Sequence, residues 1–125
     1  MPTRTILVAD DEPEQVATLQ ALLSERGYRV FTAINGEEVL RKAVEFHPNL
    51  IILDIMMPGM DGTEVAMLLR RDPRTHDIPV FFVTAVISED DQVDSEGHPN
   101  LIFAKPLKLD LLLQAVRDKM ADEPF

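Results

Sequence analysis

Five short apolar runs constrain the fold of this 125-residue chain more than any other feature of its sequence. They are rich in β-branched and aromatic residues, and they cover residues 5–9, 29–33, 50–53, 79–83 and 101–104. The third run is apolar at every position, which is typical of a strand buried on both faces of a parallel sheet. The runs therefore predict parallel strands rather than half-exposed antiparallel ones.

Helical patterns separate these runs. Apolar side chains recur at intervals of three and four residues over 16–23, 39–44, 65–69 and 112–120. Five β-α repeats joined by right-handed crossovers predict an α/β fold, in which a doubly wound parallel sheet carries helices on both faces. The stretch 86–98 has almost no apolar stripe, so we expect its helix, the fourth of five, to be short or irregular.

Composition limits the possible functions. The net charge of −10 argues against direct binding to nucleic-acid phosphates, which requires Lys and Arg. The chain has no cysteine, which excludes disulfides, thiolate metal sites and cysteine nucleophiles. It shows no signal-peptide pattern and no apolar run of bilayer length, so we expect a cytoplasmic protein without membrane contact. We expect a single domain over residues 1–125, with a core from roughly residue 4 to 120 and a tail that frays or begins a linker.

Polar residues stand where the predicted strands end. They are Asp10 and Asp11 after the first run, Asp54 after the third, Thr84 after the fourth and Lys105 after the fifth. Ligand sites in such sheets lie beyond the carboxyl ends of the strands. We therefore expect these side chains to meet at one edge of the sheet.

These groups together predict phosphoryl chemistry. Three carboxylates in one small space repel one another, and an Mg²⁺ ion with oxygen ligands would relieve that repulsion. Beside such an ion, Asp54 could act as a nucleophile toward phosphorus. The metal and Lys105 would neutralise charge on the transferred group, and the Thr84 hydroxyl could donate a hydrogen bond to it.

The same segments resemble the receiver domains of bacterial response regulators, the chemotaxis-regulator-like proteins of two-component signalling. The resemblance rests on Asp10-Asp11, on residues 53–62 (LDIMMPGMDG), on Val83-Thr84-Ala85 and on Lys105-Pro106, and it covers roughly residues 4–120. It implies a flavodoxin-like sheet with the strand order 2-1-3-4-5.

The resemblance also implies a role for each matching residue. Asp54 would accept a phosphoryl group from a histidine kinase or a histidine phosphotransfer domain. Asp11 would bind Mg²⁺ directly, Asp10 mainly through water, and Met56 through its backbone carbonyl. Lys105, followed by a cis bond to Pro106, would pair with the phosphoryl group, and Thr84 would carry the switch beside a small residue, Ala85. The phosphorylated protein would act on a downstream domain or protein. It would do so as a monomer or as a dimer that forms upon phosphorylation.

The sequence departs from the family pattern at three places. Many receivers have an aromatic switch residue where this chain has Ile102, and Phe103 should point to the opposite face of its strand. The segment 86–98 could act by ordering upon phosphorylation. Met56 and Val86 are apolar where relatives often guide a hydrolytic water, so we expect slow self-dephosphorylation.

Several alternatives remain open at this point. Asp10 and Asp11 could be only an acidic cluster at the N-terminus of a helix, where the helix dipole favours negative charge. Asp54 could be only a residue that starts a turn. The chain could instead be an Asp-nucleophile phosphohydrolase, although Met56 stands where such enzymes need a second Asp. It could also be a flavin-binding module or a docking pseudo-receiver that is never phosphorylated. A switch would turn over no external substrate, and so would not be an ordinary enzyme.

Two groups of residues are expected to have no role in the chemistry. We interpret the histidines as surface residues: His47, His76 and His98. We interpret the methionines after the third strand as local packing: Met56, Met57 and Met60.

Overall fold

The computed structural model describes residues 3–84, 101–105 and 107–121. Within these ranges, five parallel strands form one sheet in the order β2-β1-β3-β4-β5. The strands are β1 (Thr5–Ala9), β2 (Arg29–Ala33), β3 (Leu50–Asp54), β4 (Val80–Thr84) and β5 (Leu101–Ala104). This confirms the predicted α/β class and strand order.

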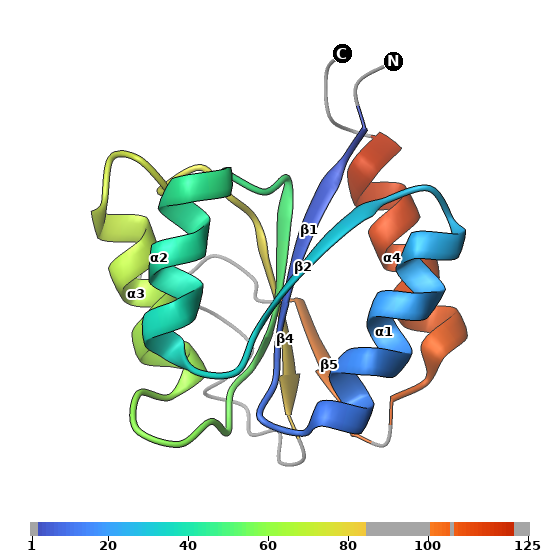
Figure 1. Cartoon of the computed structure of the whole chain (residues 1–125), viewed down its shortest axis with the longest axis horizontal. Helices are drawn as coiled ribbons and strands as arrows, with labels where there is room; N and C mark the ends of the chain where they lie inside the picture. Colours follow the sequence, from blue (N-terminus) through green and yellow to red (C-terminus); the bar gives the residue numbers. More distant parts are fainter. Residues whose placement is uncertain (1–2, 85–100, 106, 122–125) are drawn as a thin grey trace.

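In the described part of the chain, four helices pack on the two faces of this sheet (Figure 1). They are α1 (Pro13–Glu25), α2 (Gly36–Phe46), α3 (Gly62–Arg71) and α4 (Leu109–Ala121). Helices α1 and α4 cover one face, and α2 and α3 cover the other. The helix expected within 86–98 lies outside the described residues. No helix in the described ranges has the length and apolar character that crossing a bilayer requires.

Two strands extend one residue beyond their predicted ends. Asp54 still pairs with Val83, and Thr84 still pairs with Ala104. Backbone hydrogen bonding does not require an apolar side chain, so the apolar pattern stops before the strand does. As a result, these two polar residues are held by the sheet itself rather than by loops.

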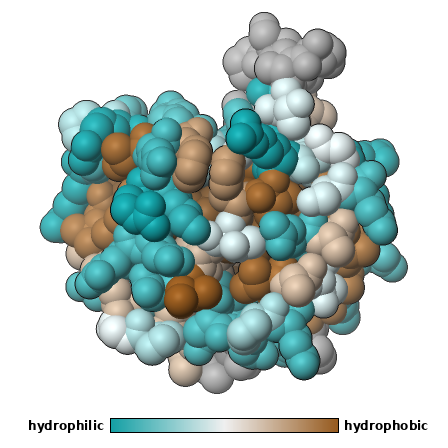
Figure 2. All heavy atoms as spheres, viewed as in Figure 1, coloured by the Kyte–Doolittle hydropathy of each residue, from teal (hydrophilic) through white to brown (hydrophobic). Residues whose placement is uncertain are grey.

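The side chains of the sheet alternate between two cores. Leu7, Ile51 and Leu53 point toward α2 and α3, whereas Ile6 and Ile52 point toward α1 and α4. All five positions of β3 are buried, as expected for a central strand. Burying one such Leu or Ile side chain stabilises the fold by about 1.5–3 kcal/mol. The outer surface in Figure 2 is mainly hydrophilic, with separate apolar patches between the polar residues.

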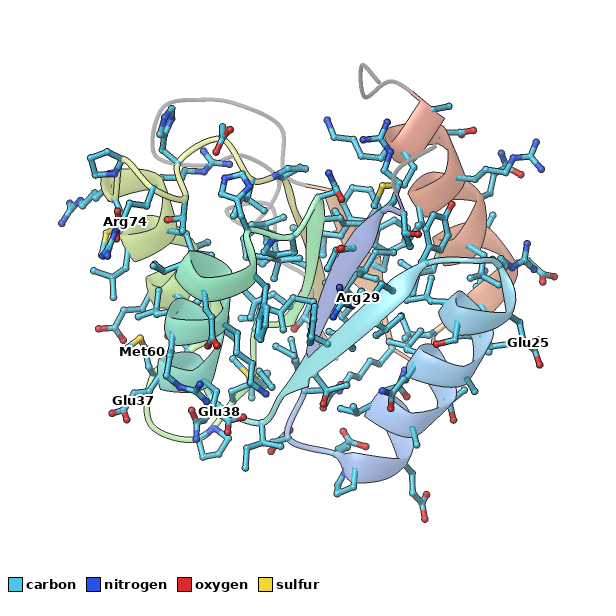
Figure 3. The ribbon with its side chains drawn as sticks, turned by 45° about the horizontal axis from the view of Figure 1, so that its top comes forward. Glu25, Arg29, Glu37, Glu38, Met60 and Arg74 are labelled. Carbon is cyan, nitrogen blue, oxygen red and sulfur yellow. The ribbon has the colours of Figure 1, made fainter. Side chains whose placement is uncertain are left out.

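The helix ends follow the signals in the sequence. Asn35 caps α2 by accepting a hydrogen bond from the Glu38 N–H at 2.9 Å, and Asp61 caps α3 in the same way through the Glu64 N–H. After α1 the chain reverses at Gly27, whose φ of +92° favours glycine. The first turn of α2 also packs closely on Met60, which is labelled in Figure 3.

Helix α3 begins directly against the end of β3. The Gly62 N–H donates to the Ile55 carbonyl at 2.8 Å. A Cβ atom on Gly62 would lie 2.6 Å from the Asp54 carbonyl oxygen and 2.7 Å from the Ile55 Cα. Only a glycine fits this contact without a shift of the backbone, which fixes the path of the chain on both sides of Asp54.

Candidate functional site

Four carboxylates converge at the carboxyl ends of β1 and β3. One oxygen each from Asp10, Asp11, Glu12 and Asp54 can be chosen so that all lie within 4.8 Å of one another. Asp10 and Asp54 are buried, with 3% and 2% of their surface exposed, whereas Asp11 and Glu12 are exposed. The structure thus brings together the three aspartates that the sequence placed at strand ends.

Lys105 supplies the positive charge at the centre of this cluster. Its Nζ atom lies 2.9 Å from Asp54 Oδ2, 3.1 Å from Glu12 Oε1 and 3.4 Å from Asp10 Oδ2. Burial alone would lower the pKa of Lys105, but its hydrogen bonds to Asp54 and Glu12 and the charges of Asp10 and Asp54 outweigh burial and raise it. Lys105 is therefore a permanent cation in the site.

A single ammonium does not balance these carboxylates. The pKa of Asp10 is raised to about 6, first by burial and then by the nearby charge of Asp54, although the Glu12 N–H and Lys105 act in the opposite direction. Carboxylate oxygens are the ligands that Mg²⁺ prefers in proteins. The residues present therefore fit a divalent cation bound among Asp10, Asp11 and Asp54.

The two oxygens of Asp54 have different partners. Oδ1 accepts a hydrogen bond from the Met56 N–H at 3.0 Å, while Oδ2 contacts Lys105. The two contacts hold the orientation of the carboxylate at the end of β3. A carboxylate held in a fixed orientation beside a cation is suited to act as a nucleophile toward phosphorus.

The other predicted site residues occupy the neighbouring strands. Thr84 is buried at the end of β4, and its carbonyl accepts a hydrogen bond from the Lys105 N–H at 2.9 Å. Ile102 packs toward α2 and α3, whereas Phe103 packs toward α1 and α4, with its ring 5.6 Å from that of Phe81. The prediction that these two residues point to opposite faces is confirmed.

Some predictions concern residues outside the described ranges. The small residue Ala85, the apolar Val86 and the cis bond before Pro106 belong to this group, as does the ordering of 86–98. They stay predictions.

The methionine interpretation is wrong for Met56. Met56 is 62% exposed, two residues after the end of β3, so it does not pack against the core. Met57 is buried and Met60 is partly buried in the core beneath α2 and α3, which confirms local packing for these two. His47 and His76 are exposed, as predicted, and His98 lies outside the described residues.

Glu12 is the site residue that the sequence reasoning missed. It comes directly before the first helical residue, Pro13, where an acidic side chain is explained by the helix dipole alone. The available signal was the third acid in the run from Asp10 to Glu12. Glu12 also lines a groove of about 570 Å³ between α1 and the start of α4, together with Gln15, Thr18, Lys105, Leu107 and Leu109.

Comparison with known proteins defines the class to which this fold and site belong. The family model of the response regulator receiver domain matches residues 6–117. The chain therefore belongs to the response-regulator receiver family, whose members are signalling domains of two-component systems. This confirms the resemblance inferred from the motifs.

The relatives include both short and long proteins. The protein PilH of Pseudomonas aeruginosa is 32% identical over 118 residues, which cover 93% of this chain and 97% of PilH. The response regulator PleD of Caulobacter vibrioides is 39% identical over 113 residues, 90% of this chain but only 25% of PleD. The chain spans between a quarter and a half of the length of several such regulators.

Solved structures show the same fold. The response regulator TrrA of Thermotoga maritima, solved in complex with Mg²⁺ and BeF, has a TM-score of 0.81 and 35% identity, and the match covers 94% of this chain and 99% of TrrA. The chemotaxis protein CheY4 of Vibrio cholerae has a TM-score of 0.85 and 25% identity, with 94% and 98% of the two chains covered. Family membership favours a signalling switch over the phosphohydrolase and flavin alternatives.

Proposed function

We propose that this chain is a phosphorylation-activated switch that accepts a phosphoryl group on Asp54 from a histidine kinase or a histidine phosphotransfer domain. The observation that carries the proposal is the Asp54 carboxylate, which is buried, contacts Lys105 at 2.9 Å and lies beside Asp10 and Asp11. A carboxylate serving only the fold would not need two further aspartates beside it.

The proposed transfer exchanges one bond to phosphorus for another. An Asp54 oxygen forms a bond to phosphorus while the N–P bond of the donor phosphohistidine breaks. The bonding electron pair leaves with the imidazole, which takes up a proton from water. A bound Mg²⁺ supplies neutralisation of the charge on the phosphoryl oxygens. Lys105 already lies against Asp54, so its ammonium needs only a short shift to pair with the new phosphoryl group.

The metal would be held by Asp10, Asp11 and Asp54, with the Met56 carbonyl as a further oxygen. Asp11 would bind directly and Asp10 mainly through water. The raised pKa of Asp10 supports this assignment, because an under-compensated carboxylate gains most from a cation. The structure of TrrA with Mg²⁺ and BeF supports it as well, since that protein is 35% identical to this chain.

Phosphorylation would be read out through Thr84, with Ile102 in place of the usual aromatic residue. The groove between α1 and residues 107–109 opens beside Lys105, which suits the docking of a phosphodonor helix. The phosphorylated chain would act on a separate output domain or protein, either as a monomer or as a dimer that forms upon phosphorylation. The cytoplasmic location and the slow self-dephosphorylation stay predictions.

Incubation with Mg²⁺ and acetyl phosphate, followed by intact-protein mass spectrometry, tests the proposal. We expect the addition of one phosphoryl group, none in Asp54→Ala, and a much slower addition in Lys105→Ala. Equal phosphorylation of Asp54→Ala, or sustained turnover of phosphate esters, would contradict it. Circular dichroism of both variants shows whether their fold is intact.

A further inference from the structure

We infer that Glu12 is a positioning residue that restrains Lys105 in the unphosphorylated site and thereby slows phosphoryl acceptance by Asp54. The inference rests on the proposed function. It assigns a role to the one member of the acidic cluster that the proposed phosphoryl transfer does not use.

The first support is the way in which Lys105 is shared. Its Nζ atom contacts three carboxylates, and the Glu12 distance of 3.1 Å lies between those of Asp54 and Asp10. The Glu12 N–H donates to Asp10 Oδ1 at 2.9 Å, which anchors the Glu12 backbone directly over the site. Glu12 therefore competes with Asp54 for the ammonium that a phosphoryl group would need.

The second support is the position of Glu12 at the entrance. Its side chain is 64% exposed, while those of Asp10 and Asp54 are almost completely buried. It lines the same groove as Lys105, so a donor that enters this groove comes close to its negative charge. Phosphodonors are anions, and a like charge at the entrance opposes their approach.

Solvent limits the size of the effect. Water screens the charges of an exposed ion pair, so the Glu12 contact should change the availability of Lys105 by at most about fivefold. Glu12 therefore modulates the rate and is not a catalytic residue. Losing it should accelerate the reaction, whereas losing any of the strand-end aspartates should abolish or slow it.

The matched variants are Glu12→Gln and Glu14→Gln. Both remove one negative charge from the start of α1 and keep the side-chain shape, but Glu14 does not belong to the carboxylate cluster. With acetyl phosphate and Mg²⁺ under pseudo-first-order conditions, we expect the phosphorylation rate constant to rise about two- to fivefold in Glu12→Gln. We expect Glu14→Gln to match the wild type.

A second measurement follows Lys105 without any donor. Nitrogen-detected NMR of the lysine ammonium reports its proton exchange with water, which we expect to be faster in Glu12→Gln than in the wild type or Glu14→Gln. Equal rate constants and equal exchange in all three proteins would overturn the inference and leave the proposed function intact. If the wild type accepts no phosphoryl group, the proposed function fails, and this inference fails with it.

Discussion

At the scale of single residues, the site contains an electrostatic conflict that the rest of the fold must support. Asp10 and Asp54 are buried within one cluster, and one lysine serves both. Burial disfavours the charged form of Asp10 and raises its pKa to about 6. The buried negative charge of Asp10 therefore lowers the free energy of unfolding of the metal-free protein.

The substitution Asp10→Asn should relieve this conflict. At about pH 7 we expect the metal-free variant to be more stable than the wild type by on the order of 1–2 kcal/mol. Because the folded-state pKa lies above the ordinary value of 3.8, the wild type regains this stability by protonation as the pH falls from about 6 toward 4. The advantage of the variant should shrink over the same range, as measured by urea unfolding.

The exposed neighbour provides the control for this prediction. Asp11→Asn removes the same charge from an exposed position and should change the metal-free stability much less. An Asp10→Asn advantage that grows as the pH falls would show that burial is not the cause.

Gly62 gives a second prediction at the same scale. In Gly62→Ala, the added Cβ would press on the Asp54 carbonyl, so we expect a loss of about 1–3 kcal/mol and slower phosphorylation. Gly27→Ala is the comparison, since its Cβ meets no atom within 4 Å and only its φ of +92° is unfavourable. The free energy of unfolding of that variant should fall by about 1–2 kcal/mol, and it should accept a phosphoryl group at the wild-type rate. Equal phosphorylation rates in both variants would count against a positioning role for Gly62.

At the scale of elements, one stripe of α2 contacts β2 near its free edge. The stripe consists of Glu38, Lys42 and Phe46. The Arg29 N–H and the Ala33 carbonyl bond toward β1, so Thr32 between them faces the open edge. Lys42 donates to the Thr32 carbonyl, and Glu38 accepts from the Ile34 N–H at 3.0 Å. Further along the same stripe, the ring of Phe46 stacks on that of Phe31 with centroids 4.0 Å apart. Lys42 and Glu38 thus occupy backbone groups with which another strand would pair.

We predict that this stripe keeps the sheet edge from self-association. The double variant Glu38→Ala/Lys42→Ala should form concentration-dependent dimers or larger species in sedimentation experiments. Glu37→Ala/Arg41→Ala removes the same two charges one position away on the same helix. Figure 3 shows Glu38 beside the segment that joins β2 to α2 and Glu37 further out. Dimers in both variants, or a monomer in the first with its fold intact by circular dichroism, would contradict the prediction.

At the scale of the whole molecule, stability and the state of the site are linked. The chain carries a net charge of −10, and part of that excess is concentrated at the carboxyl ends of β1 and β3. A cation that binds the folded site, but finds no such cluster in the unfolded chain, stabilises the fold by mass action.

Mg²⁺ should therefore raise the free energy of unfolding. At about one hundred times its dissociation constant we expect a gain of about 2.7 kcal/mol in the wild type. Asp54→Asn and Asp10→Asn should lose most of this gain, while Glu14→Gln should keep it. NaCl at matched ionic strength separates binding from screening. An equal gain in all four proteins would indicate nonspecific screening rather than a site.

The layered α/β fold and the positions where chemistry could occur follow from the amino-acid sequence alone. Apolar periodicity shows which face of each element is buried. Because parallel strands bring their carboxyl ends to one edge of the sheet, the sequence was enough to place four site residues there: Asp10, Asp54, Thr84 and Lys105. Two features could be seen only once the chain was folded: the contact of Glu12 with Lys105, 93 residues away in the chain, and the exposure of Met56. The close approach of Gly62 to Asp54 and the contacts of α2 with the β2 edge likewise appear only in the folded chain. These features depend on the directions of loops and long side chains, which packing between distant elements sets and local sequence patterns do not encode.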